Sequence, residues 1–183
     1  NFLPHLNVKN QTKMNEYFFS EVTFFKEAIN AQALRPEEVQ ELLHFKNHKL
    51  SLFVFLKKDR TLPGRLVIRN SEGEFLRDHF GHIFSIAILG HSSRGLPFHH
   101  SNGCTPMGVY TIDSVMPVAN KTHEFGRHRR LIVNFIRSSV YEDELKSYLP
   151  LRHHALHWWK QSVLGRKLGR SLLRIHGSGR KNH

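Results

Sequence analysis

The sequence predicts a mainly β protein with helical additions, in the α+β class. Six short strand-like runs lie between residues 50 and 136, and Gly, Pro and Ser turns separate them. Segments with helical spacing of apolar residues come before and after this region. Short strands with frequent turns are typical of a β-sandwich or an open barrel.

Residues 1–48 are expected to form an N-terminal helical segment. The first dozen residues show no clear period and predict a linker. Apolar residues then recur at helical spacing over residues 15–32, which predicts an amphipathic helix; they are Phe18, Val22, Phe25 and Ile29. Pro36, followed by two glutamates, opens a second helix, because proline and acidic residues suit a first helical turn. The two helices together predict a hairpin that docks on the rest of the chain.

The strand-like runs differ in the burial that they predict. In chain order they are LSLFVFLKK, GRLVIRN, EFLRD, HIFSIAILG, GVYTIDSV and RRLIVNFI. The run HIFSIAILG is apolar almost throughout, so a strand buried on both faces is expected. The run GVYTIDSV alternates in polarity, as a half-buried strand does.

Residues 137–170 predict a helical insertion between two strands. One helix is expected in YEDELKSYL and a second from Pro150 to about Gly165. A short strand, SLLRI, then leads into a glycine-rich loop. The insertion could act as a lid over a cleft or as a packing element, and the sequence leaves both possibilities open.

Composition narrows the classes of partner. The net charge is +12, so polyanions such as nucleic acid, anionic lipid or an acidic wall polymer are favoured. Cys104 is the only cysteine, which excludes a disulfide within the chain. No apolar run is long enough to span a bilayer.

Two motifs and one weaker element carry a resemblance to a known family. The first is T-P-x-G-x-[YF]-x-I, given by Thr105, Pro106, Gly108, Tyr110 and Ile112. An aromatic-glycine element follows at Phe125 and Gly126, in front of the run RRLIVNF. The last is I-H-G-[ST], given by Ile175, His176, Gly177 and Ser178. In this order, the elements resemble the catalytic domain of YkuD-type L,D-transpeptidases over roughly residues 49–183.

The resemblance implies a YkuD-like β-sandwich or open barrel that cross-links or trims peptidoglycan stem peptides in the bacterial cell envelope. It implies acyl transfer through a cysteine thioester, with no metal or other cofactor. His176 would hold or accept the thiol proton, Gly177 would let the backbone pass close to substrate, and Ser178 would help to orient the imidazole. Substrate contacts would come from Thr105, Pro106, Gly108, Tyr110, Phe125 and Gly126.

The position of the nucleophile departs from the family pattern. The family supplies its thiol from an S-x-G-C-[IV]-R motif after the I-H-G element, whereas the sequence continues for only seven residues past His176. We therefore expect a nucleophile beyond His183 and a fragment that is inactive by itself. Ser101-Asn102-Gly103-Cys104 has the S-x-G-C form, with His91 upstream, but Thr-Pro follows it instead of Ile-Arg. Cys104 is the less favoured alternative.

Other interpretations stay open at this point. The chain could be a non-catalytic wall-binding relative, or a basic nucleic-acid-binding module, although the basic tract GRKLGRSLLRIHGSGRK carries no aromatic stacking residue. His153 and His157 have the i, i+4 spacing of helical metal ligands, but no third ligand is evident. His99 and His100 could line a substrate groove or lie in an exposed turn.

Overall fold

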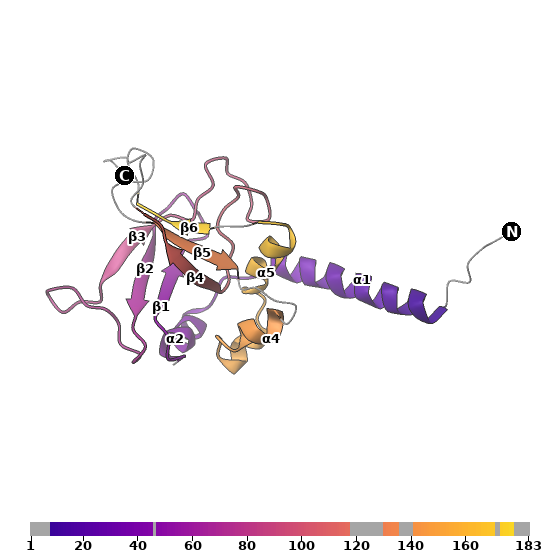
Figure 1. Ribbon diagram of the computed structural model, residues 1–183, viewed down its shortest axis with the longest axis horizontal. Coiled ribbons are helices and arrows are strands. Elements are labelled where there is room, and N and C mark those ends of the chain that lie inside the picture. The colour runs from indigo at the N-terminus through magenta and orange to yellow at the C-terminus, as the bar shows by residue number, and fades with distance from the viewer. Residues whose placement is uncertain (1–7, 46, 118–129, 136–140, 171–172, 178–183) are drawn as a thin grey trace.

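The computed structural model describes residues 8–45, 47–117, 130–135, 141–170 and 173–177. These residues form four α-helices, one 3₁₀-helix and two three-stranded antiparallel sheets, with no closed barrel among them. Figure 1 shows the sheets gathered in one part of the molecule, while the long first helix extends away from them. The α+β class is confirmed, but the described residues contain more helix than strand, so the expectation of a mainly β protein is wrong.

The first sheet has the order β1-β2-β3, from strands β1 (Ser51–Phe55), β2 (Gly64–Arg69) and β3 (Ser85–Ile88). The predicted strand EFLRD is wrong, because residues 74–78 form only isolated bridges, Arg69 with Phe75 and Arg77 with Ile83. The predicted burial of HIFSIAILG is also wrong. Its central residues Ser85, Ile86 and Ala87 are exposed, since β3 lies at an edge of this small sheet.

The second sheet has the order β4-β5-β6, from strands β4 (Tyr110–Val115), β5 (Leu131–Phe135) and β6 (Leu173–Ile175). Both outer strands pair antiparallel with β5, so β4 and β6 run in the same direction. A β-bulge between Ile112 and Ser114 leaves Asp113 as an extra residue on β4. The sheet contains Tyr110 and Ile112 of the first motif and Ile175 of the last one.

The two N-terminal helices dock on different partners. Helix α1 (Val8–Ile29) begins within the dozen residues expected to be a linker, so that expectation is wrong from Val8 onward. Its C-terminal half contacts α5 (Lys160–Lys167), where Glu27 pairs with Lys160 and Glu21 with Lys167. Helix α2 (Pro36–His44) is joined instead to β2, because Arg69 donates a 2.7 Å hydrogen bond from Nη1 to the Leu43 carbonyl.

Helices α4 (Tyr141–Lys146) and α5 and the 3₁₀-helix (Leu151–Ala155) make up most of the predicted insertion. The single helix expected over residues 150–165 is wrong, because the chain leaves helical geometry after Ala155 and starts α5 only at Lys160. This region supplies six of the eight residues of the hydrophobic core: Leu145, Leu149, Trp158, Trp159, Val163 and Leu164. Phe24 and Ala28 of α1 complete it. Of the two roles considered for the insertion, the structure supports packing.

Candidate functional site

The segment Thr105–Tyr110, which leads into β4, is fixed by contacts with α5 and within itself. Pro106 is buried, and the backbone N–H of Met107 donates a 3.0 Å hydrogen bond to Oε1 of Gln161. The Tyr110 hydroxyl donates a 2.8 Å hydrogen bond back to the Pro106 carbonyl. These contacts give the proline and the tyrosine of the first motif a structural role, independent of any substrate.

Gly108 is the one position of this motif where only glycine fits. Its φ is +154°, a region that L side chains rarely adopt, and a Cβ atom there would lie 2.0 Å from Oγ of Ser162. The Ser162 hydroxyl is itself buried and donates to the Trp159 carbonyl, so it is not free to move aside. The glycine therefore allows α5 to approach the start of β4 closely.

Cys104 ends a closed loop that begins at Gly90. The Thr105 N–H donates to the Gly90 carbonyl (3.1 Å), and the Cys104 N–H donates to the Leu96 carbonyl (2.9 Å). His91 and Cys104 are therefore the chain neighbours of the two residues that the first of these hydrogen bonds joins. Cys104 is half-buried.

Two arginines flank this loop. The Arg170 guanidinium donates to the carbonyls of Phe98, Gly103 and Cys104, and thereby ties the loop to the residues before β6. Nη1 of Arg60 is buried near Gly90 and has no hydrogen-bond partner among the described residues. Burial lowers the pKa of both guanidiniums, and the nearby Cys104 and Tyr110 side chains oppose this effect. Arg170 is one of several basic residues in its tract, and no sequence pattern sets it apart from them. Its contacts with the loop were therefore not predicted from the sequence.

Three polar side chains form a hydrogen-bonded cluster on one face of the second sheet. Asp113 accepts hydrogen bonds from the Thr111 hydroxyl (2.9 Å) and from the side-chain amide of Asn134 (2.8 Å). Thr111 and Asn134 are directly paired across β4 and β5. Thr111 and Asp113 share this face as alternate residues of the strand, and no sequence pattern signalled the bulge at Asp113.

His176 follows the last pair of β6. Ile175 pairs with Leu131, and Leu131 pairs with Val115 at the end of β4. Because side chains alternate along a strand, His176 and Arg174 lie on the same face, opposite to Ile175. Both are exposed, and Nδ1 of His176 lies 2.8 Å from the Gly177 carbonyl.

The structure does not bring all the predicted site residues together. Tyr110 begins β4, whereas His176 lies beside its end, a separation of roughly 16 Å along the strand. Thr105, Pro106 and Gly108 are at the Tyr110 end, together with Cys104. Phe125, Gly126 and Ser178 lie outside the described residues.

His153 and His157 belong to separate networks. His153 is fully buried in the 3₁₀-helix, where its Nδ1 accepts from Nε1 of Trp158 (3.3 Å) and its Nε2 lies 3.3 Å from Glu41. His157 is exposed, outside any helix, and lies 3.4 Å from Glu27. The expected placement of both on one helix is therefore wrong. Across the described part of the chain, no group of three or more His, Cys, Asp or Glu residues could hold a metal ion.

No helix among the described residues combines the length and the apolarity needed to cross a membrane. In comparisons with known proteins, no family model, curated protein or solved structure matches the chain. A functional assignment must therefore rest on the motifs and on the geometry of these residues.

Proposed function

We propose that the chain is a peptidoglycan L,D-transpeptidase domain of the YkuD type, which transfers acyl groups between stem peptides in the bacterial envelope. The observation that carries the proposal is the placement of its two motifs. The T-P-x-G-x-Y-x-I segment enters β4 and the I-H-G segment ends β6, and both strands flank β5 of one sheet. His176 is exposed just past the end of β6, whereas the hydrogen-bonded residues Thr111 and Asn134 lie toward the other end of the sheet.

In the proposed reaction, His176 holds the proton of a cysteine thiol while the sulfur attacks a peptide carbonyl of the donor stem. The carbon–sulfur bond forms, the peptide C–N bond breaks, and the departing amine takes the proton from the imidazole. An amine of a second stem, or water, then attacks the thioester and returns the proton to the thiol through the same imidazole. Backbone N–H groups around the thiol would stabilise the oxyanion.

The thiol for this role is expected in the family's S-x-G-C position, after the I-H-G element. Cys104 lies at the opposite end of β4, and Arg170 binds its carbonyl oxygen. The loop that holds Cys104 is therefore a poor source of a nucleophile for His176. Cys104 is better explained as part of a turn that positions the first motif.

A stem-peptide assay tests the proposal. Protein from the complete natural reading frame is incubated with a disaccharide–tetrapeptide, and the products are separated by chromatography and identified by mass. We expect a cross-linked dimer or a trimmed tripeptide, with loss of both in His176→Gln. If the wild-type protein converts no tetrapeptide, but still binds purified wall, the non-catalytic relative is the correct interpretation.

A further inference from the structure

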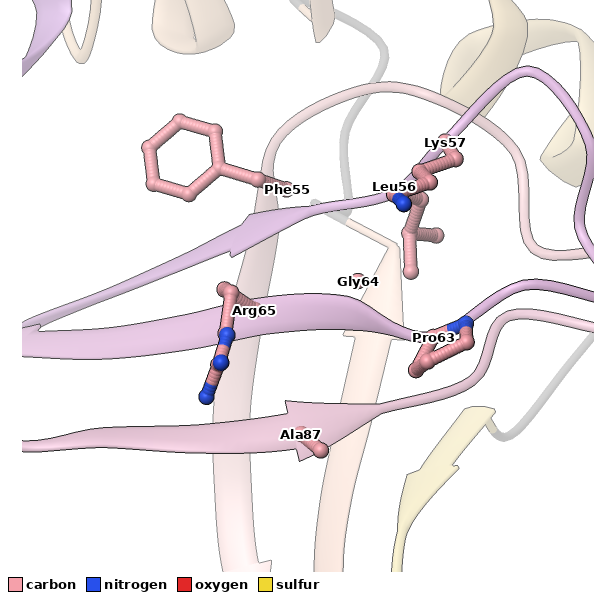
Figure 2. Close-up of a pocket in the computed structure, with 7 residues that line it drawn as sticks. All are labelled: Phe55, Leu56, Lys57, Pro63, Gly64, Arg65 and Ala87. Carbon is pink, nitrogen blue, oxygen red and sulfur yellow. The ribbon is translucent and has the colours of Figure 1, made fainter.

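The hollow at the end of the β1–β2 hairpin does not direct its charged groups to one ligand position. It has a volume of about 390 Å³ and is lined by Phe55, Leu56, Lys57, Pro63, Gly64, Arg65 and Ala87. Figure 2 shows the side chains of Lys57 and Arg65 extending in different directions. A more extensive apolar surface lies on helix α1, away from both sheets.

Helix α1 carries an apolar stripe that continues from its buried half into its exposed half. In the C-terminal half, Phe24 belongs to the hydrophobic core and Phe25 packs against it. Tyr17 lies seven residues before Phe24, so the two share nearly the same face of the helix. Phe18 has the same relation to Phe25, and Met14 lies about one helical turn before Phe18. Met14, Tyr17 and Phe18 are called the exposed stripe below.

The cover of this face ends where α5 ends. Lys167, the last residue of α5, pairs with Glu21 at 2.7 Å and lies 4.6 Å from the ring centroid of Phe24. Every residue of α1 from 13 to 20 is exposed, and the three side chains of the exposed stripe are 62–69% exposed. Figure 1 shows this half of α1 extending beyond the other described elements. The stripe therefore continues an existing packing interface without a partner from the described residues.

The charge of α1 differs from that of the rest of the molecule. The chain has a net charge of +12, whereas α1 contains three lysines and three glutamates and therefore has no net charge. A helix that binds an anionic membrane surface is typically rich in lysine and arginine on its polar face. A neutral helix that carries both signs of charge is better suited to a second copy of itself, because a two-fold interface must be self-complementary.

We propose that the exposed stripe is a self-association surface, through which two copies of the chain pair by the N-terminal halves of their α1 helices in antiparallel orientation. In a two-fold dimer the same patch of both copies forms the interface. The stripe of each copy then supplies for the other the apolar cover that α5 supplies in the C-terminal half. This inference is independent of the proposed function.

The antiparallel orientation follows from where the rest of the chain lies. The other described elements are gathered at the C-terminal end of α1 (Figure 1), and the net positive charge lies outside this helix. A parallel pair would place these two positively charged bodies at the same end, where they repel. An antiparallel pair places them at opposite ends and allows Lys13 of one copy to face Glu16 of the other.

The size of the stripe predicts a weak, reversible dimer. Side chains of this size bury about 150–250 Å² each when they are fully covered. At the observed exposure, the three side chains of each copy supply roughly 600–1,000 Å² in a two-fold pair. This area is in the range of transient protein–protein contacts, so we expect self-association at micromolar concentrations.

Sedimentation velocity of the 183-residue chain over a micromolar concentration series tests the inference. The 21.4 kDa monomer should be replaced by a species of twice that mass as the concentration rises. Phe18→Ala should weaken dimerisation about tenfold, because central aromatic side chains carry much of the binding energy of an interface.

The matched control is Phe19→Ala. Phe19 is 69% exposed, as Phe18 is 65% exposed, but it lies about 100° from Phe18 around the helix and outside the stripe. This variant loses the same side chain from the next position and should dimerise nearly as well as wild type. Circular dichroism confirms that both variants keep their helix content.

Small-angle X-ray scattering checks the orientation. An antiparallel dimer should have a clearly larger maximum dimension than the monomer, because the two bodies lie at opposite ends of the paired helices. A dimer in which the two bodies lie side by side would contradict the antiparallel arrangement.

Three outcomes would overturn the inference. One is a wild-type protein that stays monomeric throughout the series, and another is equal weakening by Phe18→Ala and Phe19→Ala, which would show non-specific association. The third is a monomer that binds phosphatidylglycerol vesicles through Phe18, because the stripe would then be a membrane contact. None of these measurements depends on conversion of a stem peptide, so they are separate from the test of the proposed function.

Discussion

At the scale of single residues, the structural requirement for glycine at position 108 can be tested by its effect on the free energy of unfolding. Gly108 combines a positive φ with contact to a buried serine, whereas Gly81, with φ of +85°, has no atom within 4 Å of a built Cβ. We expect Gly108→Ala to lower the free energy of unfolding by about 3 kcal/mol, from backbone strain and overpacking together. Urea unfolding of Gly108→Ala and Gly81→Ala separates the two contributions. Equal losses in both would show that Ser162 imposes no steric limit.

Arg170 is the second residue whose role can be isolated. Its guanidinium is the shared donor to the carbonyls of Phe98, Gly103 and Cys104. Arg170→Lys keeps the positive charge but loses the planar guanidinium that donates to three carbonyls at once. We therefore expect the free energy of unfolding to fall by about 2 kcal/mol. Amide exchange should rise in the loop from Gly90 to Thr105. Unchanged exchange in that loop would contradict the assigned role.

At the scale of elements, the contact between the 3₁₀-helix and α2 contains a buried imidazole. Burial lowers the pKa of His153, and the carboxylates of Glu41 and Glu38 only partly oppose it. Arg152 also faces Glu41, at 3.0 Å, and Trp158 donates to the ring. The neutral imidazole is therefore the form that fits this contact.

This buried imidazole predicts a pH dependence of stability. In the unfolded chain the imidazole binds a proton with its ordinary pKa of about 6.5, whereas the folded chain binds it only at lower pH. The free energy of unfolding should therefore fall as the pH drops below about 6.5. His153→Gln, in which an amide oxygen can accept from Trp158, should show a shallower fall. His79→Gln, at an exposed turn, should keep the wild-type slope, and identical slopes in all three proteins would contradict the prediction.

At the scale of the whole molecule, the sequence predicted most strands and the α+β class, because hydrophobic periodicity and turn residues report local geometry. It failed where tertiary partners decide the outcome. β3 is apolar, yet exposed, because it lies at a sheet edge, and α1 extends to Val8 although its first residues show no apolar period. The contacts of Arg170 and the bulge at Asp113 depend on residues far apart in the chain, so local patterns could not show them.

The net charge of +12 favours binding to polyanions in general, so charge alone does not distinguish peptidoglycan from DNA as the partner. A wall-binding protein should sediment with purified peptidoglycan sacculi at physiological salt and leave duplex DNA in solution. A nucleic-acid-binding module should instead show binding to DNA that falls steeply as salt rises. Parallel sedimentation and DNA titration over a salt series distinguish the two. Tight DNA binding without retention on sacculi would support the nucleic-acid alternative.

The most direct test of the central claim is intact-protein mass spectrometry after incubation with a carbapenem, using protein from the complete natural reading frame. The account predicts one covalent adduct on a cysteine other than Cys104, lost in His176→Gln and retained in Cys104→Ser. An adduct that survives in His176→Gln, or one that disappears in Cys104→Ser, would contradict it.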